Sequence, residues 1–130
     1  MPNLQELENK NMYNKPKLIV FDDFINLSPK ELKKIFQYIV SSRKYGCSCL
    51  LLAQEYTSVP KLIVRNINYI VLFRINDNIS INNIIHNHNL NDIDKELLKK
   101  VYLLCTEVPL NFMLLDFRSN DEKDRIRSKF

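Results

Sequence analysis

The sequence predicts an α/β domain built on a mainly parallel β-sheet flanked by helices. Several short apolar runs lack the alternation of a half-exposed strand and are typical of strands covered on both faces. Helical patterns separate these runs, and such alternation of strands and helices indicates an α/β fold. The predicted strands are 17–23, 49–54, 69–74 and 112–117.

The 130 residues are expected to form a single domain, 1–130. Residues 1–15 are a polar lead-in and residues 118–130 a charged tail, expected to be a frayed helix or coil. A hydrophobic content of 45% with 26% charged residues excludes a disordered chain. No apolar run approaches the roughly 20 residues of a membrane span. The polar start does not fit a signal peptide, so no membrane partner is expected.

The first helix has the clearest start signal in the sequence. Ser28 suits the N-cap, Pro29 the first helical position, and Glu31 completes a capping box. Arg43 in the last turn would complement the helix dipole, and Gly46 would end the helix. One apolar stripe follows the start at helical spacing: Leu32, Ile35, Phe36, Ile39 and Val40.

Three further helices are expected between the later strands. Pro60 can open a short helix through about Asn66, and isoleucines at helical spacing predict a helix over 79–88. Asn91 or Asp92 would cap the last one, in which Glu96 lies four residues before Lys100. The inward residues of that helix would be Ile93, Leu97, Leu98, Val101 and Leu104.

Composition narrows the function classes. The net charge of +4 mildly favours binding to polyanions such as nucleic acid or nucleotide. Three cysteines cannot pair off, which indicates a reducing compartment. Gly46 is the one glycine, so this sequence contains no glycine-rich phosphate loop.

Polar residues follow three of the four predicted strands, at the ends where active sites of parallel sheets lie. They are Asp22 and Asp23, Gln54 and Glu55, and Arg74 and Asn76. Asp22 and Asp23 end an apolar run in the form of a Walker B segment, in which one carboxylate binds Mg²⁺ and its neighbour polarises water. The alternative is a strand that simply meets a turn. Gln54 could sense a γ-phosphate or orient water, or it could merely cap a strand end.

Other candidate groups have simpler structural interpretations. Arg43 and Arg65 could bind phosphate as bidentate donors. Taken alone, Arg43 is better explained by helix-end electrostatics and Arg65 by a solvated helix face. The two histidines of 86–88 do not share a helix face, which argues against a metal site. Cys47-x-Cys49 enters a strand and is better explained by packing.

Taken together, residues 17–76 resemble the poxvirus-type DNA-packaging ATPases of large DNA viruses, a branch of the FtsK/HerA P-loop group. A weaker resemblance continues to Asp116. The resemblance implies a partial P-loop NTPase (RecA/ASCE-like) domain. The segments that carry it are 18–24, 42–45, 49–56, 59–66 and 69–74.

The resemblance also assigns roles to individual residues. It implies that Asp22 coordinates Mg²⁺, that Asp23 is the catalytic acid, and that Gln54 is the polar sensor. Arg43 and Arg65 match family arginines, and one of them would reach a neighbouring subunit. The implied cofactors are Mg²⁺ and ATP, and the implied activity is translocation of double-stranded DNA into a capsid by a homo-oligomeric ring, in the host cytoplasm or the virion.

The chain departs from the family in lacking Gly-Lys-Ser or Gly-Lys-Thr. It therefore looks like the C-terminal part of such an ATPase, inactive alone and dependent on an N-terminal ATPase segment or on other ATPase subunits. In this fold group the phosphate-loop strand lies between the strands that correspond here to 49–54 and 69–74. We expect those two strands either to pair directly or to receive a strand from a partner.

Two alternatives remain open at this stage. A degenerate relative could bind DNA or assemble with an intact ATPase without hydrolysing ATP. A two-metal nuclease could use Asp22, Asp23 and Asp116, provided that these three carboxylates lie close together.

Overall fold

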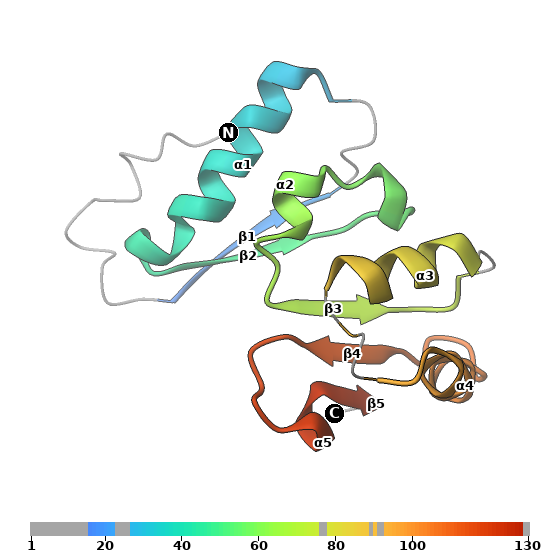
Figure 1. Ribbon diagram of the computed structural model, residues 1–130. Helices are drawn as coiled ribbons and strands as arrows, with labels where there is room; N and C mark the ends of the chain where they lie inside the picture. The colour runs from blue at the N-terminus through green and yellow to red at the C-terminus, as the bar shows by residue number, and fades with distance from the viewer. Residues whose placement is uncertain (1–15, 23–26, 76–77, 89, 91–92, 129–130) are drawn as a thin grey trace. The chain divides into compact units, whose positions relative to one another are not determined.

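The computed structural model describes residues 16–22, 27–75, 78–88, 90 and 93–128. The chain divides into two compact units, Met1–Asn66 and Ile67–Phe130, here called unit 1 and unit 2. Each contains strands and helices, which confirms the α/β class (Figure 1). The prediction of a mainly parallel sheet is wrong, because unit 1 holds a parallel pair and unit 2 an antiparallel three-stranded sheet.

In unit 1 the strands β1 (Lys17–Phe21) and β2 (Cys47–Leu51) run parallel, with Lys17 opposite Cys47 and Phe21 opposite Leu51. The crossover between them is α1 (Pro29–Ser41), and α2 (Lys61–Val64) follows β2. Alternate strand residues pack toward the helices, which is the two-residue period of a strand with one covered face. The buried core of this unit consists of Phe21, Ile35, Tyr38 and Ile63.

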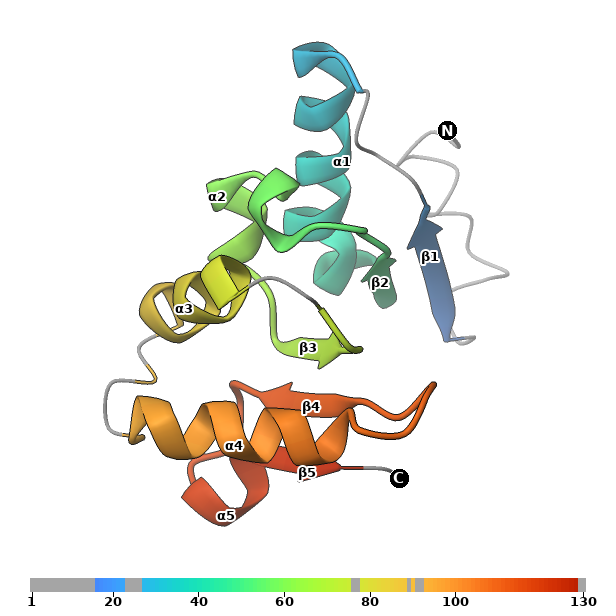
Figure 2. The same ribbon diagram turned by 90° about the vertical axis from the view of Figure 1, so that its right-hand side faces the viewer.

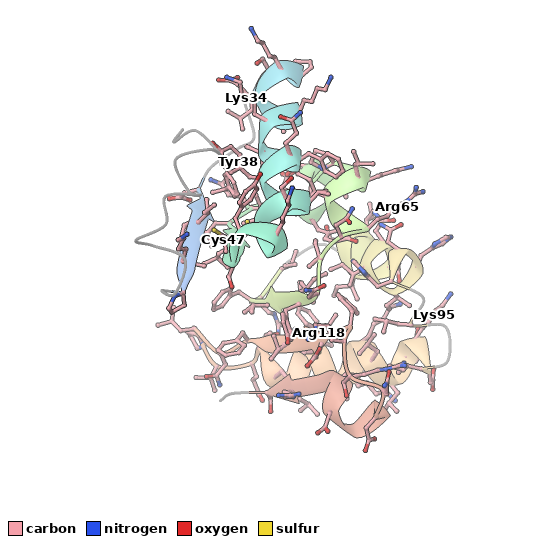
Figure 3. All side chains as sticks on the ribbon, turned by 90° about the vertical axis from the view of Figure 1, so that its left-hand side faces the viewer. Lys34, Tyr38, Cys47, Arg65, Lys95 and Arg118 are labelled. Atoms are coloured by element: carbon pink, nitrogen blue, oxygen red, sulfur yellow. The ribbon has the colours of Figure 1, made fainter. Side chains whose placement is uncertain are left out.

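Tyr38 links the helix and the strands of unit 1. It extends from α1 toward the β1–β2 pair (Figure 3), where its ring meets Phe21 edge-on at 6.3 Å between centroids. The predicted capping box at the start of α1 is confirmed. The Ser28 hydroxyl accepts a hydrogen bond from the Glu31 amide, and the Glu31 carboxylate accepts one from the Ser28 amide at 2.8 Å.

The end of α1 differs from the prediction. The α-helix stops at Ser41, and a 3-10 helix over Ser42–Tyr45 carries Arg43 beyond its last turn. Gly46 then adopts a left-handed conformation with φ of 62° and turns the chain into β2. As a result β2 begins two residues earlier than the sequence predicts, and Gln54 lies beyond its end.

In unit 2 the strands β3 (Tyr69–Leu72), β4 (Met113–Asp116) and β5 (Ile126–Ser128) form an antiparallel sheet. Two helices, α3 (Asn78–Asn87) and α4 (Lys95–Cys105), connect β3 to β4. A crossover with one helix returns the chain to the end where a strand began, so the next strand runs parallel to it. Here two helices bring the chain back to the end where β3 finishes, so β4 runs antiparallel to β3. The tail predicted as frayed helix or coil instead forms α5 (Glu122–Arg125) and β5.

Tyr102 anchors α4 to the end of β3 and is fully buried. Its hydroxyl donates to the Phe73 carbonyl at 2.9 Å and accepts from the Ile75 amide. The prediction that Asn91 or Asp92 caps α4 is wrong, because the cap is Asp94, whose carboxylate accepts from the Glu96 amide. Of the residues expected to face inward, Leu98 is buried, whereas Leu97 and Leu104 are exposed. α4 is seen lengthwise in Figure 2.

None of the helices within the described ranges is long and apolar enough to span a bilayer.

Candidate functional site at the carboxyl end of the parallel pair

The carboxyl ends of β1 and β2 meet at one edge of the parallel pair. Phe21 and Leu51 are register partners, and the Leu52 amide donates to the Phe21 carbonyl at 2.9 Å, which extends the ladder by one bond. Asp22 follows Phe21 directly, and Gln54 comes two residues after Leu52. Both side chains are exposed. Asp22 therefore follows the end of β1 directly, and Gln54 lies three residues beyond the end of β2.

Asp23, the second predicted acid, lies outside the described residues. Nothing in the structure assigns it a position, so its role stays a prediction that depends on its place beside Asp22 in the sequence.

The donor chemistry at this edge fits a shared magnesium site. Mg²⁺ prefers hard oxygen ligands and is usually held by one or two carboxylates, with substrate phosphates and waters completing the octahedron. The exposed Asp22 carboxylate can supply one such oxygen. Within the residues that the structure describes, no cluster of three or more metal-ligating side chains forms.

The two predicted arginines lie elsewhere in unit 1. Arg43 belongs to the 3-10 helix Ser42–Tyr45, and its side chain lies outside the described part of the chain. Arg65 is the C-cap of α2, where its amide donates to the carbonyls of Ile63 and Lys61. Its side chain is exposed and extends outward from the end of α2 (Figure 3). An exposed guanidinium at this position is available to a phosphate or to another chain.

The polar residues after Arg65 have structural roles. The Asn66 side chain donates to the Leu62 carbonyl at 2.8 Å and so satisfies one of the last carbonyls of α2. The Asn68 carbonyl accepts from the Phe117 amide at 2.9 Å, which continues the β3–β4 pairing. Both asparagines are thus explained by the fold.

Asp116 is also accounted for by structure. This buried carboxylate accepts from the Arg118 amide at 2.9 Å and pairs with Arg127 at 3.2 Å. It lies opposite Tyr69, at the start of β3. Both carboxylate oxygens already have partners, which removes the structural support for its proposed use in a two-metal nuclease.

The remaining candidate groups pack within their own units. The ring of His88 stacks on Phe117 at 4.2 Å between centroids, and burial lowers the pKa of this imidazole. Cys49 packs against the core of unit 1, and burial raises the pKa of its thiol. Cys47 is buried at the start of β2. These environments favour the packing interpretation of the cysteine pair.

The family model described as Poxvirus A32 protein matches residues 2–115. The chain belongs to the poxvirus A32 family. This is a family of DNA-packaging ATPases, which agrees with the resemblance seen in the sequence. The match spans β1, β2, β3 and most of β4, and therefore includes the edge that carries Asp22 and Gln54. No curated protein and no solved structure is significantly similar to this A32 family member.

Proposed function

We propose that this chain provides the magnesium-binding and sensor edge of a viral DNA-packaging ATPase, whose phosphate-binding loop comes from another polypeptide segment. The observation that carries the proposal is the parallel pairing of β1 with β2, in a chain that belongs to a packaging ATPase family. In the proposal, Asp22 and Gln54 act together at the end of the pair where both strands finish.

Each residue of the edge would have a distinct task. Asp22 would hold Mg²⁺ through its carboxylate, and the metal would neutralise charge on the transferred phosphoryl group. Asp23 would accept a proton from the attacking water. Gln54 would orient that water or contact the γ-phosphate. Arg65 would reach the phosphates of its own or a neighbouring subunit.

The sequence itself explains why a second segment is needed. A triphosphate is held mainly by the backbone amides of a glycine-rich loop and by the loop lysine. Gly46 is the only glycine, and it serves the turn into β2. Without that loop, an exposed Asp22 can bind Mg²⁺ only weakly, so the chain alone is expected to be inactive.

Unpaired strand edges support the same proposal. In the described part of the chain β2 pairs with β1 alone, and β3 pairs with β4 alone. Each of these two strands therefore keeps one unpaired edge that an added strand could fill.

Complementation tests this function. The chain alone should hydrolyse no ATP, whereas addition of a polypeptide bearing Gly-x-x-x-x-Gly-Lys-Ser/Thr should restore DNA-stimulated hydrolysis. In the restored enzyme Asp23→Ala should lower kcat by about 10²–10⁴-fold. The matched control is Asp124→Ala, which removes an exposed carboxylate from unit 2. Hydrolysis by the chain alone that survives Asp22→Ala would contradict the proposal.

A catalytically inactive DNA-binding or assembly role is the second candidate. The net charge of +4 and the exposed lysines of α1 (Lys30, Lys33 and Lys34) favour it. It predicts binding to double-stranded DNA without nucleotide, with an affinity that falls steeply as salt rises. It also predicts that no phosphate-loop segment restores hydrolysis, which separates it from the first candidate.

A further inference from the structure

The solvent side of α1 carries a group of lysines. Lys30, Lys33 and Lys34 are all exposed, and they lie in the N-terminal half of the helix, where Figure 3 labels Lys34. Spacings of three and four residues make Lys30 a neighbour of both other lysines on the helix surface. The side of α1 that faces the strands buries Ile35 and Tyr38 instead. We call the three lysines the α1 basic face.

The acidic residue of α1, Glu31, does not neutralise this face. Glu31 lies four residues before the buried Ile35 and therefore shares that residue's side of the helix. Its carboxylate accepts hydrogen bonds from the Ser28 amide and hydroxyl at 2.8 Å and 2.7 Å. These bonds lower the pKa of Glu31 more than the charge of Lys34 does. None of the three lysines forms an ion pair with a described residue.

Helix stability does not explain the α1 basic face. The N-terminus of a helix carries partial positive charge, so a lysine in the first turn, such as Lys30, is unfavourable there. Lys30 and Lys34 are like charges four residues apart, which also destabilises a helix. A negatively charged partner would remove both costs, which indicates that the lysines serve an interaction.

The other long lysine-bearing helix, α4, balances its charges. Lys95, Lys99 and Lys100 share that helix with Glu96, and Lys99 pairs with Glu96 at 3.2 Å. The N-cap of α4, Asp94, adds a further acid. The two halves of the sequence show the same contrast. Residues 67–130 contain equal numbers of acidic and basic residues, so the whole net charge of +4 lies in residues 1–66.

We propose that the α1 basic face binds the phosphate backbone of double-stranded DNA without reading the base sequence. A duplex presents about one negative charge per 1.7 Å of its axis. Several phosphates therefore lie within the roughly 6 Å that separates Lys30 from Lys34 along α1. Each lysine is a point charge with donors for phosphate oxygens. The inference concerns DNA contact by α1 and does not rest on ATP hydrolysis at the Asp22 edge.

The composition of α1 favours a duplex over other anionic partners. Proteins that bind single strands stack the bases on exposed aromatic side chains. Both aromatic residues of α1, Phe36 and Tyr38, pack into the core of unit 1. A helix that lies in a membrane surface inserts its apolar face between the lipids. The apolar face of α1 already packs against the strands of unit 1.

Fluorescence anisotropy of a labelled DNA duplex, titrated with the full chain without nucleotide over a salt series, tests this surface. The combined changes Lys30→Gln, Lys33→Gln and Lys34→Gln should weaken binding at least about tenfold at low salt. They should also lower the slope of log Kd against log salt by about 3, since each phosphate contact contributes about 0.9. The matched control is Lys95→Gln, Lys99→Gln and Lys100→Gln in α4, which should change that slope by less than about 1. An unchanged α1 variant, or equal losses in both variants, would overturn the proposal.

A charge-preserving variant and two other probes sharpen the test. Arginine at the same three positions of α1 should retain binding, because it keeps the charge. Circular dichroism would check that every variant is folded. The duplex should bind more tightly than single-stranded DNA of the same length, and more tightly than vesicles of equal parts phosphatidylcholine and phosphatidylserine. Tighter binding to either probe would overturn the assignment to duplex DNA. Failure of the ATPase complementation would leave all these outcomes unchanged, so the two proposals fail separately.

Discussion

Both units contain an apolar strand that ends in an aspartate, yet the two carboxylates have different surroundings. In unit 1 Asp22 follows β1 and is exposed at the edge of a parallel pair. In unit 2 Asp116 ends β4, is buried, and binds Arg127 together with the Arg118 amide. The same sequence pattern therefore gives an available carboxylate in one unit and a structural one in the other.

Strand direction explains the difference. In unit 2 the chain turns back after β4, so that β5 runs antiparallel beside it and Arg127 reaches Asp116. In unit 1 a crossover through α1 separates β1 from β2, and the two strands finish at the same edge. Among the described residues of unit 1, no strand turns back beside β1 and no cation pairs with Asp22. Parallel pairing thus keeps strand-end polar groups free for a ligand.

The largest effect on stability is expected at the anchor of unit 2. Tyr102→Ala should lower the free energy of unfolding by about 3–5 kcal/mol, because it empties a fully buried aromatic site. Tyr102→Phe should cost about 1–3 kcal/mol, since it leaves the Ile75 amide and the Phe73 carbonyl without their partner. Urea unfolding followed by circular dichroism measures both.

Tyr38→Phe in unit 1 is the matched control for the hydroxyl. The Tyr38 ring is buried, but its hydroxyl makes no hydrogen bond to any described residue. Its removal should change the free energy of unfolding by less than about 0.5 kcal/mol. Equal losses from the two Tyr→Phe changes would show that the hydroxyl bonds of unit 2 are not what distinguishes Tyr102.

The two aspartates offer a direct test of the comparison. Asp116→Ala should destabilise the protein by about 1–3 kcal/mol, because it leaves the Arg118 amide and Arg127 without their acceptor. Asp22→Ala should stay within about 0.5 kcal/mol of the original chain, since the side chain is exposed. Denaturant titration at neutral pH measures both. A larger loss from Asp22→Ala than from Asp116→Ala would reverse the assignment of roles.

The smallest of the destabilising changes concerns the capping box of α1. Ser28→Ala removes the side-chain acceptor of the Glu31 amide and should cost about 1 kcal/mol at neutral pH. Hydrogen bonds from the Ser28 hydroxyl and amide lower the pKa of Glu31 from its ordinary value of 4.5. Because the pKa of Glu31 is lower in the folded state, the charged carboxylate stabilises that state fully at pH values above 4.5. This stabilisation is lost as the pH falls through the lowered pKa.

The free energies of unfolding of the original chain and of Ser28→Ala, measured from pH 7 to pH 3, check this sign. The gap between them should narrow below about pH 4.5. A gap that widens on acidification would mean that Glu31 does not contribute as a charged acceptor.

Local signals in the sequence predicted the elements well, whereas strand direction depends on distant contacts. The capping box at Ser28 is encoded within a few residues and is found where expected. Gly46 was expected to end α1, but the α-helix already stops at Ser41 and Gly46 follows a 3-10 helix. The direction of β4 depends on how α3 and α4 pack, which no local pattern contains. The strand β5 was missed because its three residues, Ile126–Ser128, carry no apolar run and gain their structure from pairing with β4.

The candidate site was predictable only in part, because local sequence signals mark the strand ends but not the distant contacts. An apolar run followed by Asp22, and a second one followed by Gln54, suffice to place both residues at one edge once the strands are parallel. The role of Asp116 could not be predicted, because its partner Arg127 lies in the tail and meets it only through β5. Likewise the structural use of Asn66 requires the carbonyl of Leu62 at the end of α2.

Paramagnetic broadening by Mn²⁺ tests the central claim most directly. Mn²⁺ with ATP would be added to isotope-labelled chain mixed with a polypeptide that bears a phosphate loop, and amide signals would be followed by NMR. The account predicts selective broadening of Asp22 and Gln54, while the signal of Asp116, whose carboxylate is already paired, stays sharp. Broadening centred on Asp116, or uniform broadening with none selective for Asp22 and Gln54, would contradict it.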